Sequence, residues 1–249
     1  MEKISTVRAA DTCLRILQHI AFAEGPLGVT QIAAQVDTAK GAVHKHLRTL
    51  IDHGMVVQNA QTSLYSVGPK VWLMGQRAPQ AQELSEIALP LMRATRDELG
   101  LAVVLSVPTP RSAFVLATLS SNQPIDIGVK PGSELSLHAS AQGLVMLAFG
   151  KSELREALKP PLAKITPKTI TDIDEILAAV KVVAAQGYAV TPEQSLLGIN
   201  ALSAPIFDRN GTLVGSIGLI GSVQYLPPQP EARQIEAVRN LTRQISDRL

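Results

Sequence analysis

TAKGAVHKHLRTL, the stretch from Thr38 to Leu50, decides how the first part of this chain folds. Wound as an α-helix, it gathers apolar side chains at the spacing i, i+4, i+7 and i+8, and these are Val43, Leu47, Leu50 and Ile51. Another face of the helix carries the basic side chains Lys40, His44, Lys45 and Arg48. A helix with one buried and one cationic face suits the DNA major groove. The pattern also fits an ordinary solvated helix face, so the flanking sequence must decide.

Two more helices are expected before this stretch. Apolar residues at helical spacing predict a first helix over about residues 9–23, ended by Gly25-Pro26, and a short second helix over residues 29–36. Asp37-Thr38 forms a tight turn, and the Thr38 hydroxyl can cap the third helix. The three helices follow one another in the order of a helix-turn-helix.

A β-hairpin is expected after the third helix. Gly54 stands where a left-handed residue would end that helix. Residues 56–57 and 64–67 predict two short strands joined by the polar loop 59–63. Three helices and a hairpin describe a winged helix-turn-helix, whose last helix enters the major groove.

The charge of the chain is concentrated in this first part. The 249 residues are 46% hydrophobic and 18% charged, which suits two globular domains. Residues 1–75 hold seven Lys and Arg against five acids, and four of the five histidines, whereas residues 76–249 hold sixteen charges of each sign. The net charge of +2 therefore lies in the first third, which supports contact with nucleic acid.

Several classes of site are excluded by composition and spacing. Cys13 is the only cysteine, so intrachain disulfides are impossible and a thiolate metal cluster is not expected. His44 and His46 are two residues apart on a helix and point in different directions, which argues against a metal pair. No apolar run reaches the roughly 18 residues that span a bilayer, and the N-terminus has no signal-peptide pattern. We expect a cytoplasmic protein without membrane contact, metal or cofactor.

The rest of the chain predicts a second domain. Residues 76–82, QRAPQAQ, look like a linker, and the helix expected over about residues 83–99 contains Pro90, which should kink it or split it. Strands are expected at 101–107, 113–119, 125–129, 188–190, 199–204 and 212–220, and helices at 138–149, 152–158, 173–186 and 231–249. The fold class we expect is α+β: a winged helix-turn-helix over residues 1–75 and a sensor-type, GAF-like domain over residues 83–249, with an antiparallel sheet flanked by helices.

A candidate ligand site lies at the start of the helix after Leu137. Backbone N–H groups of Ser140, Ala141 and Gln142 fall in its first turn, where the helix dipole and unpaired donors bind carboxylates. The alternative is that Ser140 merely caps the helix. Ser140, His138 and Glu193 also supply the members of a nucleophilic triad. However, no G-x-S-x-G motif surrounds Ser140, so we interpret His138 as a structural residue and do not expect a hydrolase.

Six segments of the chain carry a family resemblance. In the first part they are RAADTCLRIL (8–17), VTQIAAQ (29–35), AVHKHLRTLIDHGMV (42–56) and YSVGPKV (65–71). In the second they are GSELSLHASAQGLVMLA (132–148) and GYAVTPEQSLLGINALSAPIFDRNGTLVGSIGL (187–219). Together they resemble the IclR family of bacterial transcription regulators over nearly the whole chain. The chain departs from the family's usual residues at five positions. The family usually has two hydroxyl residues where Gly41 and Ala42 stand, and Arg where Lys45 stands. It usually has an apolar residue in place of His46 and Lys in place of Leu144.

The resemblance implies which residues meet DNA and effector. Operator DNA is expected at Arg8, Thr38, Lys40, Gly41, Ala42, His44, Lys45, Arg48, Gln61 and Ser63. A small organic acid is expected at Ser140, Ala141, Gln142, Thr191, Glu193, Ile199, Ala201, Ser203, Gly218 and Ile220. Glu193 either lines the pocket or caps local backbone, and the sequence leaves both open.

The expected pocket lining indicates the type of acid. Family members that bind very small keto acids carry an acid, a cysteine and two serines where this chain has Thr191, Ala201, Gly218 and Ile220. Gly218 is expected to open space, while Ala201 and Ile220 make the wall apolar. The hypothesis is a carboxylate larger than glyoxylate or pyruvate, with an aromatic or branched apolar body.

The function expected is a ligand-responsive regulator of a catabolic operon, acting as a repressor or an activator. A single helix-turn-helix buries little surface, so a homodimer is expected on the DNA, and the resemblance implies that dimers can pair into tetramers. Ligand and DNA binding are expected to be coupled through residues 76–99. The rival interpretations are an enzyme that acts on a small organic acid, for which no acid–base pair is found, and a DNA-binding protein without an effector.

Overall fold

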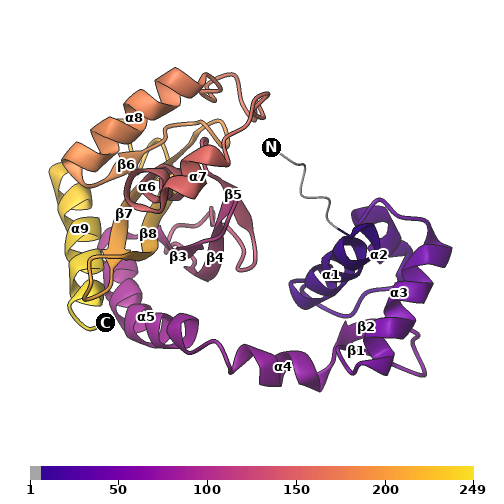
Figure 1. Cartoon of the computed structure of the whole chain (residues 1–249). Helices are drawn as coiled ribbons and strands as arrows, with labels where there is room; N and C mark the ends of the chain where they lie inside the picture. Colours follow the sequence, from indigo (N-terminus) through magenta and orange to yellow (C-terminus); the bar gives the residue numbers. More distant parts are fainter. Residues whose placement is uncertain (1–6) are drawn as a thin grey trace. The chain divides into compact units, whose positions relative to one another are not determined.

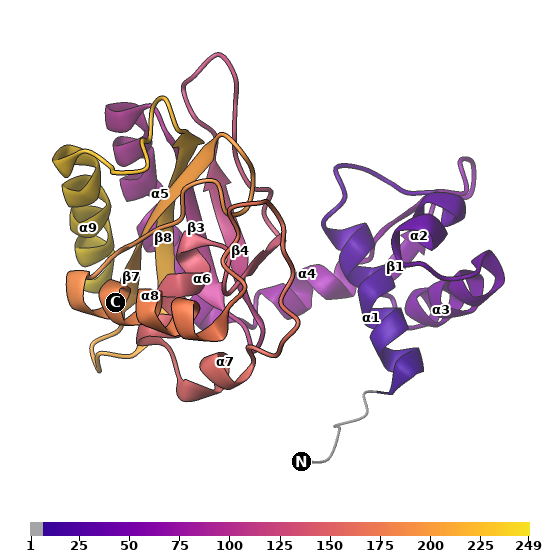
Figure 2. The same cartoon turned by 90° about the horizontal axis from the view of Figure 1, so that it is seen from above.

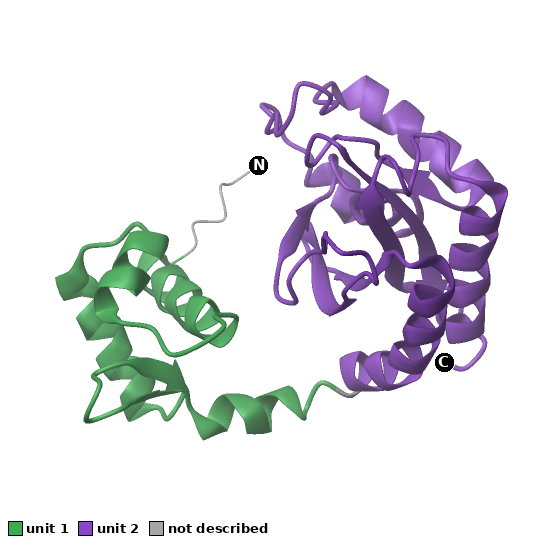
Figure 3. Cartoon of the chain, turned by 180° about the vertical axis from the view of Figure 1, so that it is seen from behind, with its two compact units in different colours: residues 1–79 green, residues 80–249 purple. Residues whose placement is uncertain are grey.

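The computed structural model describes residues 7–249, which form two compact units, Met1–Pro79 and Gln80–Leu249 (Figure 3). Residues 1–6, where no signal peptide is expected, lie outside the described residues. Each unit has its own hydrophobic core. Within the described residues, no helix is long and apolar enough to cross a membrane.

The first unit is a winged helix-turn-helix, as expected from the sequence (Figure 1). Its elements are α1 (Arg8–Ala21), α2 (Val29–Gln35), α3 (Lys40–Asp52), β1 (Val56–Gln58), β2 (Tyr65–Val67) and α4 (Pro69–Gly75). Ile16 of α1, Ile32 of α2 and Leu47 of α3 meet fully buried in its core. Because Val43 and Leu47 are four residues apart, one face of α3 packs inward and the opposite face stays in solvent.

The two ends of α3 differ from each other in how they are stabilised. Thr38 does not cap the helix as expected: α3 starts at Lys40, and the Thr38 hydroxyl donates to the carbonyl oxygen of Val36 at the end of α2. The reason is that the helix begins one residue later than a Thr38 cap would require, so that Ala39 takes the N-cap position. At the other end Gly54 has φ +70° and its N–H donates to Ile51, which confirms the expected left-handed termination.

The hairpin and α4 complete this unit. β1 and β2 pair antiparallel, with Val56 opposite Val67. The sequence reasoning missed α4, whose first residue, Pro69, loses no hydrogen bond in a first turn. α4 leaves three large apolar side chains exposed, namely Trp72, Leu73 and Met74.

The second unit is a six-stranded antiparallel sheet between two pairs of helices (Figure 2). Its strands are β3 (Ala102–Pro108), β4 (Ser112–Leu119), β5 (Glu134–Ser136), β6 (Ala189–Val190), β7 (Ile199–Phe207) and β8 (Leu213–Ser222), in the order β5-β4-β3-β8-β7-β6. Its helices are α5 (Pro79–Leu99), α6 (Ala141–Phe149), α7 (Ser152–Glu156), α8 (Ile173–Gln186) and α9 (Ala232–Ser246). The expected α+β class is confirmed.

Alternation along the strands divides the core into layers. One face of the sheet packs against α5 and α9, and it carries the side chains of Val103, Leu105, Ile217 and Leu219. The residues between them point to the opposite face, which α6 covers, and α8 packs against α6. The face beneath α6 includes Val104 and Ile220, and it forms the floor of the cavity described below.

Three expectations for this unit need correction. α5 begins at Pro79 rather than at about residue 83, and it continues through Pro90 without splitting. α6 begins at Ala141, three residues later than expected. Residues 125–129 form no strand, because their segment is held by side chains: Asp126 accepts from the Ser121 N–H, and Thr118 donates to the carbonyl of Val129. The strand paired with β4 is β5, farther along the chain.

The packing of α6 against its own N-terminal loop allows a direct test. A Cβ atom on Gly143 would lie 2.3 Å from the carbonyl oxygen of Ser136 and 2.5 Å from Cα of Leu137. Because both contacts are backbone, Gly143→Ala should lower the free energy of unfolding of the second unit by about 3 kcal/mol, despite the better helix propensity of alanine. Chemical denaturation followed by circular dichroism measures this loss.

Gly128→Ala is the matched control in the same unit. A Cβ atom there meets only Cγ2 of Thr118, at 3.5 Å, so the stability should change by less than about 0.5 kcal/mol. Equal stabilities of the two variants would contradict the tight packing of α6.

Candidate functional site

The basic residues expected to meet DNA lie on the solvent face of α3. Lys40, Gly41, His44, Lys45 and Arg48 are exposed, while Ala42 is half-buried. Within residues 7–249 no carboxylate forms an ion pair with the three full cations of this helix. Unpaired cations on one helix face are what phosphate contacts require.

The remaining residues expected at the DNA lie outside α3. Arg8 is exposed at the first turn of α1, and Thr38 is half-buried in the turn before α3. Gln61 and Ser63 are exposed in the loop of the hairpin, where the Asn59 side chain accepts from the N–H of Gln61. These positions therefore belong to three separate segments of the first unit.

The second candidate site is the N-terminus of α6. Ser140 is its N-cap: Oγ accepts from the Gly143 N–H at 3.0 Å and donates to the Ser136 carbonyl at 2.6 Å. The cap pairs one donor of the first turn. The N–H groups of Ala141 and Gln142 have no acceptor among the described residues. Ser140 therefore caps this helix while two N–H groups of its first turn stay unpaired within the described residues.

A cavity of about 120 Å³, which we call the effector cavity, opens at this helix end. Residues from β5, α6, β7, β8 and the loops between them line it, and no charged residue is among them: Ile127, Gly128, Val129, Leu135, Ser140, Gln142, Thr191, Ser195, Leu196, Ile199, Asn200, Ala201 and Ile220. Thr191 is buried, and its hydroxyl makes no hydrogen bond within the described residues. The cavity thus combines an apolar wall with a few free polar groups.

Six of the ten expected effector residues line this cavity: Ser140, Gln142, Thr191, Ile199, Ala201 and Ile220. The other four lie elsewhere. Ala141 is buried in the first turn of α6, and the Ser203 hydroxyl donates to the carbonyl of Ile217. Gly218 is covered by the side chain of Gln142, so the space beside this glycine is already occupied.

Glu193 binds local backbone and a lysine rather than the cavity. It has φ +58°, accepts from the Gly198 N–H at 2.9 Å and pairs with Lys168. The hydrogen bond from Lys168, and then the one from Gly198, hold the pKa of this carboxyl below its usual range. Thr166 donates to the Glu193 carbonyl. These bonds hold the loop that contributes Ser195 and other lining residues to the cavity.

The members of the nucleophilic triad are not assembled. His138 bonds to Ser136 through Nδ1 and to the carbonyl of Ala163 through Nε2, while Ser140 Oγ donates to backbone. His138 is buried in the loop, where it was expected as a structural residue. Within the described residues no cluster of three His, Cys, Asp or Glu could hold a metal ion.

The sequence reasoning missed the part of the cavity supplied by the loop before β5. Ile127 and Val129 alternate with small or polar residues, a pattern that we interpreted as a strand. The same alternation turns both side chains to one side of the irregular segment, where they pack with Leu135 and Ile220. The sequence shows the alternation of apolar residues, but it does not show which residues they pack against.

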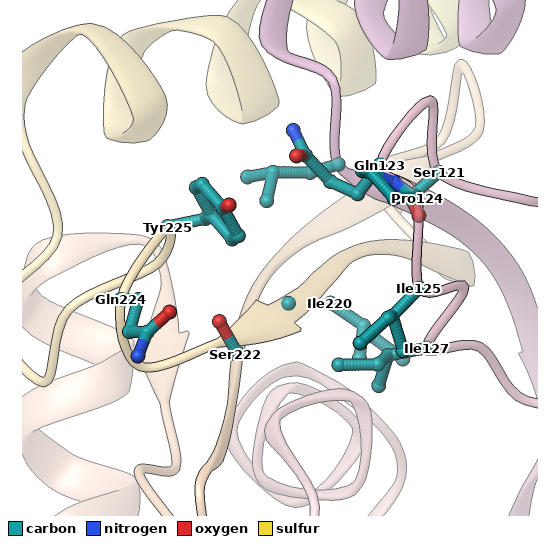
Figure 4. Close-up of a pocket in the computed structure, with 11 residues that line it drawn as sticks. Ser121, Gln123, Pro124, Ile125, Ile127, Ile220, Ser222, Gln224 and Tyr225 are labelled. Atoms are coloured by element: carbon teal, nitrogen blue, oxygen red, sulfur yellow. The ribbon is translucent and has the colours of Figure 1, made fainter.

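A second cavity of about 230 Å³ lies beside the effector cavity (Figure 4). Ile127 and Ile220 line both cavities. In Figure 4, Ile125 and Ile127 lie close to Ile220, whereas Tyr225 and Gln123 lie across the cavity from them. Two branched apolar side chains therefore separate the two spaces.

A DNA-binding unit followed by a unit with a cavity at a helix N-terminus is the organisation of a ligand-responsive transcription regulator. Family comparison agrees: residues 9–60 match the IclR helix-turn-helix domain, and residues 76–247 match the IclR C-terminal domain of bacterial transcriptional regulators. The chain belongs to the IclR family, whose members are regulators of transcription and not enzymes.

Curated relatives match along nearly their whole length. The HTH-type transcriptional regulator BhcR of Paracoccus denitrificans is 29% identical, over 96% of this chain and 86% of its own. The glycerol operon regulatory protein of Streptomyces coelicolor is also 29% identical, over 96% of this chain and 95% of its own. The repressor AllR of Escherichia coli is 26% identical, over 97% and 90%.

Solved structures show the same fold. An IclR homolog from Microbacterium hydrocarbonoxydans, complexed with 4-hydroxybenzoate, superposes with a TM-score of 0.81 at 20% identity, over 97% of this chain and 98% of its own. The IclR protein of Thermotoga maritima superposes with a TM-score of 0.68 at 24% identity, over 98% and 99%.

Substitution of a single cation tests the α3 surface. Lys45→Ala should weaken binding to operator DNA and reduce the slope of log K against log salt by about one, because one phosphate contact is lost. Fluorescence anisotropy at several salt concentrations measures both quantities. Lys181→Ala, on the exposed surface of α8, is the control and should leave the slope unchanged. A Lys45→Ala slope equal to that of the parent would remove this contact from the interface.

Proposed function

We propose that this regulator senses an organic carboxylate with an apolar body, for which an aromatic acid is our first candidate, and controls a catabolic operon. The observation that carries the proposal is the effector cavity, where free backbone donors of α6 meet a wall without charged residues. The free N–H groups and the helix dipole favour an anion at one end. The apolar wall favours a hydrocarbon body at the other.

The dimensions of the two cavities support a body larger than that of a two- or three-carbon keto acid. An apolar cavity of about 150 Å³ takes up benzene in another protein, which is close to the 120 Å³ of the effector cavity. Rotation of Ile127 and Ile220 would join this space to the second cavity of about 230 Å³. The complex of a protein of the same fold with 4-hydroxybenzoate supports an aromatic acid as a candidate.

DNA recognition is assigned to the exposed face of α3 and the hairpin loop. One α3 reads only a half-site, so we propose that the chain binds a pseudo-palindromic operator as a homodimer, with pairing of dimers into a tetramer as a further step. The effector changes DNA affinity only if it binds the DNA-competent and DNA-incompetent states unequally. Because Leu84, Ala88 and Met92 fix α5 in the core of the second unit, we place the coupling at residues 76–78, between α4 and α5.

A panel of acids tests the effector class. Isothermal titration calorimetry of the full chain with glyoxylate, pyruvate, benzoate and 4-hydroxybenzoate should give a Kd at least about tenfold lower for the aromatic acids, because each buried CH group adds transfer free energy. The same acids should change the affinity of the protein for its operator. Binding of glyoxylate and pyruvate alone would refute the proposal.

A further inference from the structure

A fully buried side-chain amide nitrogen beside the effector cavity has no hydrogen-bond partner among the described residues. Gln142 is 1% exposed, and its Nε2 makes no hydrogen bond. Its carboxamide lines the effector cavity, directly after the free N–H groups of the first turn of α6. Buried amides in folded proteins are almost always paired, so an unpaired one at a cavity wall indicates a ligand.

A second carboxamide lines the same cavity and behaves differently. Asn200 donates through Nδ2 to the carbonyls of Leu226 and Pro227 and accepts from the N–H of Ala201. Both its amide nitrogen and its oxygen therefore have partners, and the two bonds from the nitrogen hold the loop after β8. The contrast shows that the protein can satisfy a glutamine or asparagine at this wall, and that Gln142 is not held in that way.

The position of Gln142 depends on the absence of a side chain at residue 218. A Cβ atom on Gly218 would lie 2.2 Å from Nε2 and 2.7 Å from Cδ of Gln142. The carboxamide therefore rests on the bare backbone of β8, and any larger residue there would move it. From the sequence, the space beside Gly218 was expected to hold the ligand. In the structure the side chain of Gln142 occupies this space.

We propose that the Gln142 side chain is a specificity-determining donor for the effector, and that Gly218 is the seat that positions it. This inference rests on the proposed carboxylate site at the N-terminus of α6. The two free backbone N–H groups bind one end of the acid group. The Gln142 Nε2–H donates to an oxygen of the same ligand, either the second carboxylate oxygen or a neighbouring hydroxyl or carbonyl oxygen.

The arrangement selects organic acids although no positively charged side chain of the protein lines the cavity. All the donors that line the effector cavity are neutral, so recognition relies on hydrogen bonds from preorganised N–H groups and on the helix dipole. An apolar molecule of the same shape would leave the buried amide unpaired and should bind poorly. Gln142 thus distinguishes organic acids from neutral hydrocarbons of equal size.

The first experiment replaces the amide by an apolar side chain of similar length. In Gln142→Met the ligand-free protein should melt at the same temperature as the parent or higher, because an unpaired buried donor is removed. The Kd for benzoate, measured by calorimetry on the full chain, should rise by about ten- to a hundredfold, the value of a hydrogen bond to a charged group. A lower melting temperature, or an unchanged Kd, overturns the inference.

Gln194→Met is the matched control. Gln194 is also buried and has an unpaired Oε1, but its side chain does not line the effector cavity. The benzoate Kd of this variant should stay within about twofold of the parent. An equal loss of affinity in both glutamine variants would show that burial alone causes the effect and would overturn the inference.

The seat is tested by a double-mutant cycle. Gly218→Ala should weaken benzoate binding by about tenfold in the parent, because the added methyl group moves Gln142, but by less than about twofold in Gln142→Ala. If the losses of benzoate affinity from the two substitutions are additive, the residues act independently, and Gly218 does not position Gln142.

The two levels of the proposal can fail separately. If none of the four acids binds the parent protein, the effector class is wrong. The ligand-free melting temperatures then decide about Gln142 alone. A melting temperature of Gln142→Met below that of the parent makes the amide structural and overturns the inference. Equal or higher stability supports it.

Discussion

The structure depends on how closely the first turn of α6 packs on the loop that leads into it. Ser140 bonds to Ser136 and to Gly143, and Gly143 lies against the backbone of Leu137 with no room for a side chain. This contact fixes the helix end over the sheet, where Ser140 and Gln142 line the effector cavity. The positive end of the helix dipole therefore lies at the cavity, which is the electrostatic basis of the proposed carboxylate site.

Local signals in the sequence were sufficient for most of the fold. The spacing of Val43, Leu47 and Leu50 alone determines the buried face of α3. The helix expected over residues 173–186 is α8, and Gly187, with φ +81°, ends it. The predictions of secondary structure failed where the conformation of a segment depends on residues far from it in the sequence. Residues 125–129 have the apolar alternation of a strand, but Asp126 and Thr118 bind the backbone of this segment. α4 was missed because its apolar side chains face solvent and show no inward stripe.

The sequence indicated where the candidate ligand site lies, but not how its residues contact one another. Ser140 indicates the helix start, and a helix start provides donors whatever surrounds it. The roles of Ser203 and Gly218 depend on register: Ser203 lies opposite Gly218 in the β7–β8 ladder, yet its hydroxyl bonds to the Ile217 carbonyl. The contact between Gln142 and Gly218 joins a helix to a strand 76 positions later in the chain. Spacing along a single chain gives no information on such a contact.

The outermost strands of the sheet have a consequence for how copies of the protein meet. β5 has 3 residues and β6 has 2, whereas β7 and β8 in the interior have 9 and 10. Short borders offer few unpaired backbone groups to a neighbouring molecule, which protects the sheet from growing into an aggregate. A neighbouring molecule that paired with β5 or β6 would therefore gain a ladder of only two or three residues.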